Sequence, residues 1–155
     1  MGAETIFALS SAAGKAGVSV VRVSGPQAFN SLEALTGGNS ARPREALYAK
    51  LSSGDGGLID RALVLPFKAP ASFTGEDVVE YHIHGSAAVL LALIKALSSQ
   101  HGHRLAERGE FTRRAFENGK MDLTEAEAIA DLIDAETDMQ REQALSHGWI
   151  VVPFV

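Results

Sequence analysis

The segment Asp77–Gly85, DVVEYHIHG, most constrains what this chain can fold into, because its apolar and polar residues alternate strictly. Alternation with a period of two predicts a β-strand with one apolar and one polar face. The two sets of residues are Val79, Tyr81 and Ile83 against Glu80, His82 and His84. A strongly apolar segment, 87–100, follows Ser86, which is a suitable helix N-cap. We therefore expect the apolar face of this strand to pack against the helix that follows it.

Shorter patterns along the chain predict the remaining elements. Strands are predicted at 5–10, 18–25, 46–53 and 58–67, with the last two joined by the turn residues GDGG. Further helices are predicted from Pro26 to the Gly37-Gly38 pair, near 109–119 and over 124–145, the last with Thr124 and Glu127 as a capping box. The segment 101–108 is expected to be a loop. Strands and helices without strict alternation favour an α+β fold.

Composition excludes several classes of protein. The chain has 155 residues and a net charge of −5, which argues against holding nucleic acid by bulk electrostatics. It contains no cysteine, which excludes disulfides and thiolate chemistry and is consistent with a cytoplasmic protein. No apolar run has the length of a membrane span. These features predict one compact domain in the cytoplasm.

The polar face of the strand at 77–85 allows two interpretations. Glu80, His82 and His84 would stand in a row about 7 Å apart, and two histidines with a carboxylate are a known metal-ligand set. A small metal-dependent enzyme is therefore one hypothesis. We favour a polar or ligand-facing strand surface without a metal, since no further histidine or aspartate motif completes a coordination sphere.

Arginine and lysine residues give three further candidates. Arg22 stands among valines on the same strand face as Val20 and Ser24, so it requires an acidic partner or an anionic ligand unless it is simply exposed at an edge. Gly14-Lys15 lacks the other residues of a phosphate-binding loop, so we expect no guanine-nucleotide binding. The segment RGEFTRRAFENGK, 108–120, is interpreted as a solvent-exposed helix surface with ion pairs.

Several long motifs occur in an order that resembles one known family. They are TIFALS, VVRVSG, SFTGED followed by the Glu80 strand with its His-Gly end, RGEFTRRAFENGKMDL, and EAEAIADLIDA. Residues 5 to about 145 are similar to the N-terminal domain of the tRNA-modification GTPases called MnmE or TrmE. The final segment 146–155, SHGWIVVPFV, does not match this family.

The resemblance implies a fold, a division of the chain and a ligand. The fold would be similar to the folate-binding domain of the glycine-cleavage aminomethyltransferase. Residues 1–121 would be the folate-binding and dimerisation domain, 122–145 the first helix of a central helical domain, and 146–155 an atypical tail. The cofactor would be 5-formyltetrahydrofolate. Its contacts would be Arg22, Glu80 and Lys120, with His84 as a further candidate, and either Arg22 or Lys120 would hold the glutamyl tail.

The resemblance also implies a function for the whole protein. Family members modify C5 of the wobble uridine of tRNA together with the partner MnmG, and their GTPase domain uses GTP, Mg²⁺ and K⁺. This chain lacks the GTPase motifs, so we expect a homodimeric, folate-binding fragment without catalytic activity of its own.

Overall fold

The computed structural model describes residues 3–11, 17–39 and 42–147. Over these ranges it is an α+β domain, as predicted, with one mixed sheet in the strand order β3-β4-β5-β2-β1-β6. Only β1 and β6 pair in parallel. The strands are β1 (Thr5–Leu9), β2 (Val18–Ser24), β3 (Leu47–Ser52), β4 (Leu58–Phe67), β5 (Val78–His84) and β6 (His103–Leu105), and the helices are α1 (Ala28–Thr36), α2 (Ala87–Ser98), α3 (Glu110–Glu117) and α4 (Leu123–His147).

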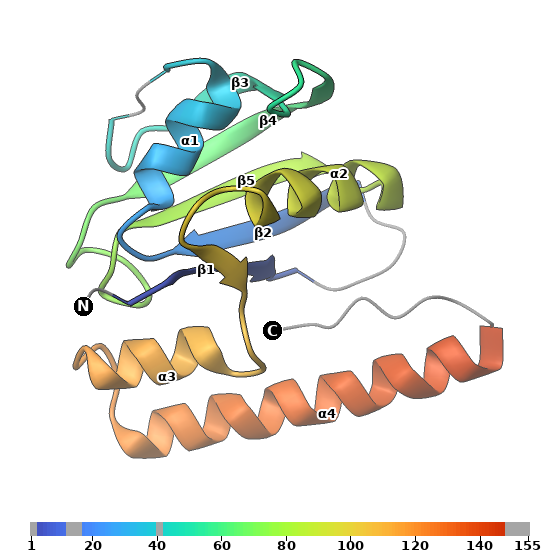
Figure 1. The fold of residues 1–155 in the computed structure, drawn as a ribbon. Helices are drawn as coiled ribbons and strands as arrows, with labels where there is room; N and C mark the ends of the chain where they lie inside the picture. Colours follow the sequence, from blue (N-terminus) through green and yellow to red (C-terminus); the bar gives the residue numbers. More distant parts are fainter. Residues whose placement is uncertain (1–2, 12–16, 40–41, 148–155) are drawn as a thin grey trace.

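The two faces of the sheet are covered differently. Helices α1 and α2 lie on one side and α3 and α4 on the other (Figure 1). The main core joins Val79, Tyr81 and Ile83 of β5 to Leu32 of α1 and Leu93 of α2, so the alternation predicted for this strand is confirmed. On the other side, Phe111 of α3 packs on Ile6 and Ala8 of β1. Burying such apolar side chains supplies most of the favourable free energy of folding.

Helix α3 covers the end of this second face at β1, β2 and β6, and the strands β3 and β4 at the other end carry exposed side chains. Tyr48 on β3 and Leu63 on β4 pair directly across the strands, and their exposed fractions are 66% and 41%. Residues that pair directly across two strands lie on the same face of the sheet. Leu63 pairs with His82 on β5, so these two side chains are neighbours on this face. This exposed part of the face, on β3 and β4, lies next to Glu80, His82 and His84 on β5.

The structure corrects three details of the sequence-based prediction. Residues 103–105 form a strand and not a loop, because three residues are too few to show a period of two. Helix α1 begins at Ala28, so Pro26 precedes it. The capping box of α4 is Asp122 with Glu125: each side chain accepts a hydrogen bond from the other's backbone N–H, at 2.8 and 3.2 Å.

Helix α4 extends to His147, two residues into the segment expected to be an atypical tail. The rest of that tail, 148–155, lies outside the described residues. Within the described ranges, no helix has both the length and the apolar composition that crossing a membrane requires.

Candidate functional site

Glu80 and Arg22 face each other across two central strands. The antiparallel register of β2 and β5 places Arg22 directly opposite Glu80, on the face away from α1 and α2. Burial lowers the pKa of the Arg22 guanidinium, and the negative charge of Glu80 partly opposes that change. The sequence placed both residues correctly on a strand face, but only the pairing of two strands 58 positions apart makes them neighbours.

Arg22 lies between two aromatic rings. Its guanidinium carbon is 4.7 Å from the ring centre of Phe73 and 5.4 Å from that of Phe111, distances at which a cation is attracted to a ring face. Its Nε is buried and has no hydrogen-bond partner among the described residues. A small cavity of about 140 Å³ adjoins it, lined also by Ile129 and Ile133 of α4. The apolar stripe of α4 therefore faces this cavity within the same chain.

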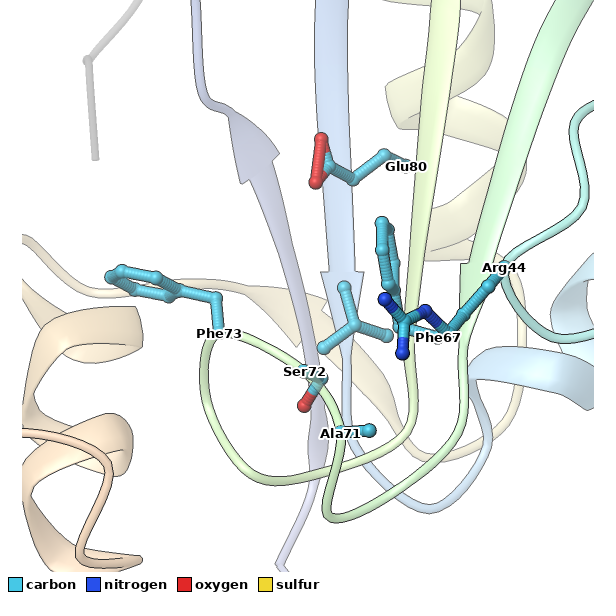
Figure 2. A pocket seen from close by; sticks show the side chains of 7 residues that line it. Arg44, Phe67, Ala71, Ser72, Phe73 and Glu80 are labelled. Atoms are coloured by element: carbon cyan, nitrogen blue, oxygen red, sulfur yellow. The ribbon is translucent and has the colours of Figure 1, made fainter.

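Glu80 lines a separate and larger cavity of about 410 Å³. Its other lining residues come from the loop before β3, from β4, from the loop 68–77 and from β5, namely Arg44, Phe67, Ala71, Ser72, Phe73 and Val78. Figure 2 shows the Arg44 side chain extending toward this cavity from the side opposite Phe73, whose ring points away from Glu80. Phe73 lines both cavities, and its ring lies against the Arg22 guanidinium.

The carboxylate of Glu80 is only partly satisfied by its neighbours. The side chain is 21% exposed, and Nε2 of His82 lies 3.9 Å from its Oε2. Within the part of the chain that the structure describes, no hydrogen bond reaches this carboxylate. A half-buried carboxylate without donors is suited to accept hydrogen bonds from a ligand.

Lys120 and His84, the other residues predicted for the site, lie apart from this cavity. Nζ of Lys120 donates to the carbonyl of Pro70 at 3.0 Å, beneath the loop that carries Phe73. Nδ1 of His84 lies 2.8 Å from the Asp60 carboxylate at the far end of β5. The histidines of the polar row therefore have different acidic neighbours, and no group of three or more His, Cys, Asp and Glu in the described ranges is arranged to hold a metal ion.

The interpretation of 108–120 as an exposed helix surface with ion pairs is wrong for two of its charged residues. Glu110 and Arg114 are only 2% and 7% exposed. Arg104 donates to both carboxylate oxygens of Glu110 at 2.7 and 2.6 Å, and Arg114 donates to Glu110 at 3.3 Å. The alternation of charges in the sequence cannot distinguish such a buried network from a solvated helix face.

The network also holds the loop 68–77 in place. Arg114 donates to Glu76 at 3.1 Å, and Oγ of Ser24 on β2 donates to the same carboxylate at 2.9 Å. Asn118 donates to the carbonyl of Thr74 at 2.8 Å. Gly75 has a φ of 81°, and a Cβ there would approach Asn118 to 2.9 Å. The loop that carries Phe73 is therefore fixed to α3 by part-buried hydrogen bonds, of which the one from Arg114 to Glu76 is charge-assisted.

Three residues of the site were not identified as candidates from the sequence. Arg44 follows a proline in a loop without periodicity, so no pattern distinguished it from other surface arginines. Phe73 and Phe111 stand within the motifs SFTGED and GEF, but only the folded chain shows that both rings contact Arg22.

Comparisons with known proteins agree with these motifs. The family model described as GTP-binding protein TrmE N-terminus matches residues 5–120. A tRNA modification GTPase MnmE from Parvibaculum lavamentivorans is 59% identical over 143 residues, which cover 92% of this chain and 33% of that protein. Proteins of the same name from Roseobacter denitrificans and Rickettsia bellii are 58% and 59% identical, and each match covers 92% of this chain and 33% or 32% of the relative. The chain thus spans about a third of the length of these curated relatives.

Proposed function

Because the chain belongs to the family of TrmE N-terminal domains, we propose that it binds 5-formyltetrahydrofolate in the cavity that Glu80 lines and that it forms a homodimer. The rest of the proposal concerns the whole protein. Together with GTP, Mg²⁺ and K⁺ in a GTPase domain, and with MnmG as partner, it would modify C5 of the wobble uridine of tRNA in the cytoplasm. The similarity to the aminomethyltransferase fold and the division at residues 121 and 145 remain parts of this proposal.

The Glu80 carboxylate carries the proposal. The pterin ring of a folate has a donor edge that resembles a guanidine, and a carboxylate can accept two parallel hydrogen bonds from it. Glu80 lines a cavity of about 410 Å³, and Phe67 in the same lining offers aromatic surface to a flat ring. A mostly apolar cavity with a few polar groups is typical of small-molecule sites.

The other candidate contacts fit this site in different ways. Arg22 pairs with Glu80 across the strands but lines the neighbouring cavity, where its guanidinium lies against the ring of Phe73. Lys120 lies beneath the same loop. His84 is bound to Asp60 and is the least suited of the four residues. Arg22 and Lys120 would therefore favour binding of an anionic ligand by their positive charge and by supporting the loop 68–77, and not by direct contact with the ring.

The metal-dependent alternative is less well supported by the geometry. His84 is bound to Asp60, and only His82 remains near Glu80. A calorimetric titration of this chain with 5-formyltetrahydrofolate tests both hypotheses. We expect saturable binding that a chelator does not change, and a His82→Ala variant with affinity within twofold of wild type. Binding that is abolished by the chelator, or lost in His82→Ala to the same degree as in Glu80→Gln, would support the metal site instead.

The exposed apolar residues on β3 and β4 offer a surface where the proposed dimer contact can be tested by mutation. Ile129 and Ile133 of α4 line the cavity beside Arg22 within the same chain. The exposed pair Tyr48 and Leu63 is a better candidate contact, since exposed apolar patches mark interfaces. We expect light scattering to give the mass of a dimer for wild type.

The variant Leu63→Arg should shift the population toward monomer. Leu91 on α2 is 62% exposed and lies on the opposite side of the sheet, so Leu91→Arg is the matched control and should remain dimeric. A wild-type chain that stays monomeric at high concentration would contradict the dimer, and a dimer unaffected by Leu63→Arg would place the contact elsewhere.

A further inference from the structure

The cavity at Glu80 contains one positive charge that no motif predicted. Among the described residues that line it, Arg44 is the only lysine or arginine. Arg22 lines the neighbouring cavity, and Nζ of Lys120 is bonded to a backbone carbonyl. A ligand that donates hydrogen bonds to Glu80 therefore meets Arg44 as the cation of the same cavity.

The backbone of Arg44 is held in an unfavourable conformation. Among the residues that the structure describes, it is the only one other than glycine with a positive φ, at 66°. Its N–H donates to the carbonyl of Pro66 at 2.7 Å, which fixes the loop against the end of β4. A side chain costs free energy in this left-handed region, where glycine does not. Such an outlier beside a cavity indicates a use for the side chain.

We propose that Arg44 binds a carboxylate of the ligand whose ring is held by Glu80, an inference that rests on the proposed folate binding. The ligand class is dipolar: a flat ring with hydrogen-bond donors at one end and a carboxylate at the other. Phe67, Val78 and Ala71 line the same cavity and provide apolar contact for the part of the ligand between these groups. A guanidinium can pair with a carboxylate through two parallel hydrogen bonds, which an ammonium cannot.

The test is calorimetry on this chain with two probes, 5-formyltetrahydrofolate and 6-methyltetrahydropterin, which has no glutamyl tail. In Arg44→Gly, the affinity for the folate should fall by about ten- to a hundredfold, the range for a lost charged hydrogen-bond pair, and the affinity for the pterin should stay within twofold. Glycine also relieves the strained backbone, so Tm should rise by about 1–4 °C. A gain in stability with a loss of binding separates a ligand contact from damage to the fold.

Arg42→Ala is the matched control, because it removes the same charge two residues away without lining the cavity. It should leave both affinities within twofold. If Arg44→Gly leaves folate affinity unchanged, weakens both probes equally, or behaves like Arg42→Ala, the assignment of the carboxylate is overturned while folate binding stands. If wild type binds neither probe, the proposed function fails and this inference fails with it.

Discussion

Replacement of Glu80 with glutamine is expected to lower the affinity for 5-formyltetrahydrofolate by about ten- to a hundredfold. Glutamine keeps the size of the side chain, but it removes the negative charge and presents an amide donor to the donor edge of the pterin. Charged hydrogen bonds contribute roughly 1.5–3 kcal/mol, which corresponds to that range of affinity. Calorimetric titration of wild type and Glu80→Gln measures the effect directly.

Two comparisons make the Glu80 result interpretable. The 6-methyltetrahydropterin probe should lose affinity to the same degree as the folate, because Glu80 is expected to contact the ring and not the tail. Glu33→Gln, on an exposed position of α1 on the opposite side of the sheet, should bind like wild type. An affinity within twofold of wild type in Glu80→Gln would show that the pterin ring is not held by this carboxylate.

The largest effect on stability is expected from Glu110→Gln, which should lower the free energy of unfolding at pH 7 by about 3–5 kcal/mol. Glu110 is buried and accepts hydrogen bonds from both Arg104 and Arg114. Glutamine removes the charge that the two guanidinium groups share, and it turns an amide donor toward one of them. Among the described residues, Arg104 then keeps only Glu4 and Arg114 only Glu76 as ion-pair partners. Urea unfolding at pH 7 measures the loss.

The loss should depend on pH in a defined direction. Burial by itself raises the pKa of Glu110, but hydrogen bonds from Arg104 and from the Glu107 backbone, with the charges of Arg104 and Arg114, lower it from 4.5 to about 2. A carboxylate with a lowered pKa in the folded state stabilises that state above the unfolded pKa, and this contribution is lost as the pH falls toward the folded pKa. The difference between wild type and Glu110→Gln should therefore shrink by about 3 kcal/mol between pH 5 and pH 2.

The matched control for Glu110 is on the same helix. Glu117 is exposed and lies 4.0 Å from Arg113, so Glu117→Gln should change the free energy of unfolding by less than about 0.5 kcal/mol. If Glu110→Gln were as mild as Glu117→Gln, the network of Arg104, Glu110 and Arg114 would not be important for stability. The two variants thus separate a buried ion pair from one in solvent.

Much of the fold could be predicted because the relevant signals are local. The alternation at 77–85 identified β5 and its buried face, and the serine before the next apolar segment identified the start of α2. Long motifs, one of which includes the strand at 77–85, indicated the family, and the family match over residues 5–120 confirms it. Errors occurred where an element was too short for a period, as in β6, or where the capping residue lies two residues before the predicted one, as at the start of α4.

The sequence alone predicted the α+β class, indicated the family and placed Arg22 and Glu80 on strand faces, because periodicity and motifs depend on neighbours along the chain. Only the tertiary structure decided what surrounds them. Register between β2 and β5 brings Arg22 opposite Glu80, and the packing of separate loops adds Arg44 and Phe73. The burial of Glu110 with Arg104 and Arg114 likewise depends on how α3 meets β6. Charged side chains that cannot be distinguished in a sequence interact with very different free energies when some are buried and others stay in solvent. Contacts between segments far apart in the chain determine which of them are buried.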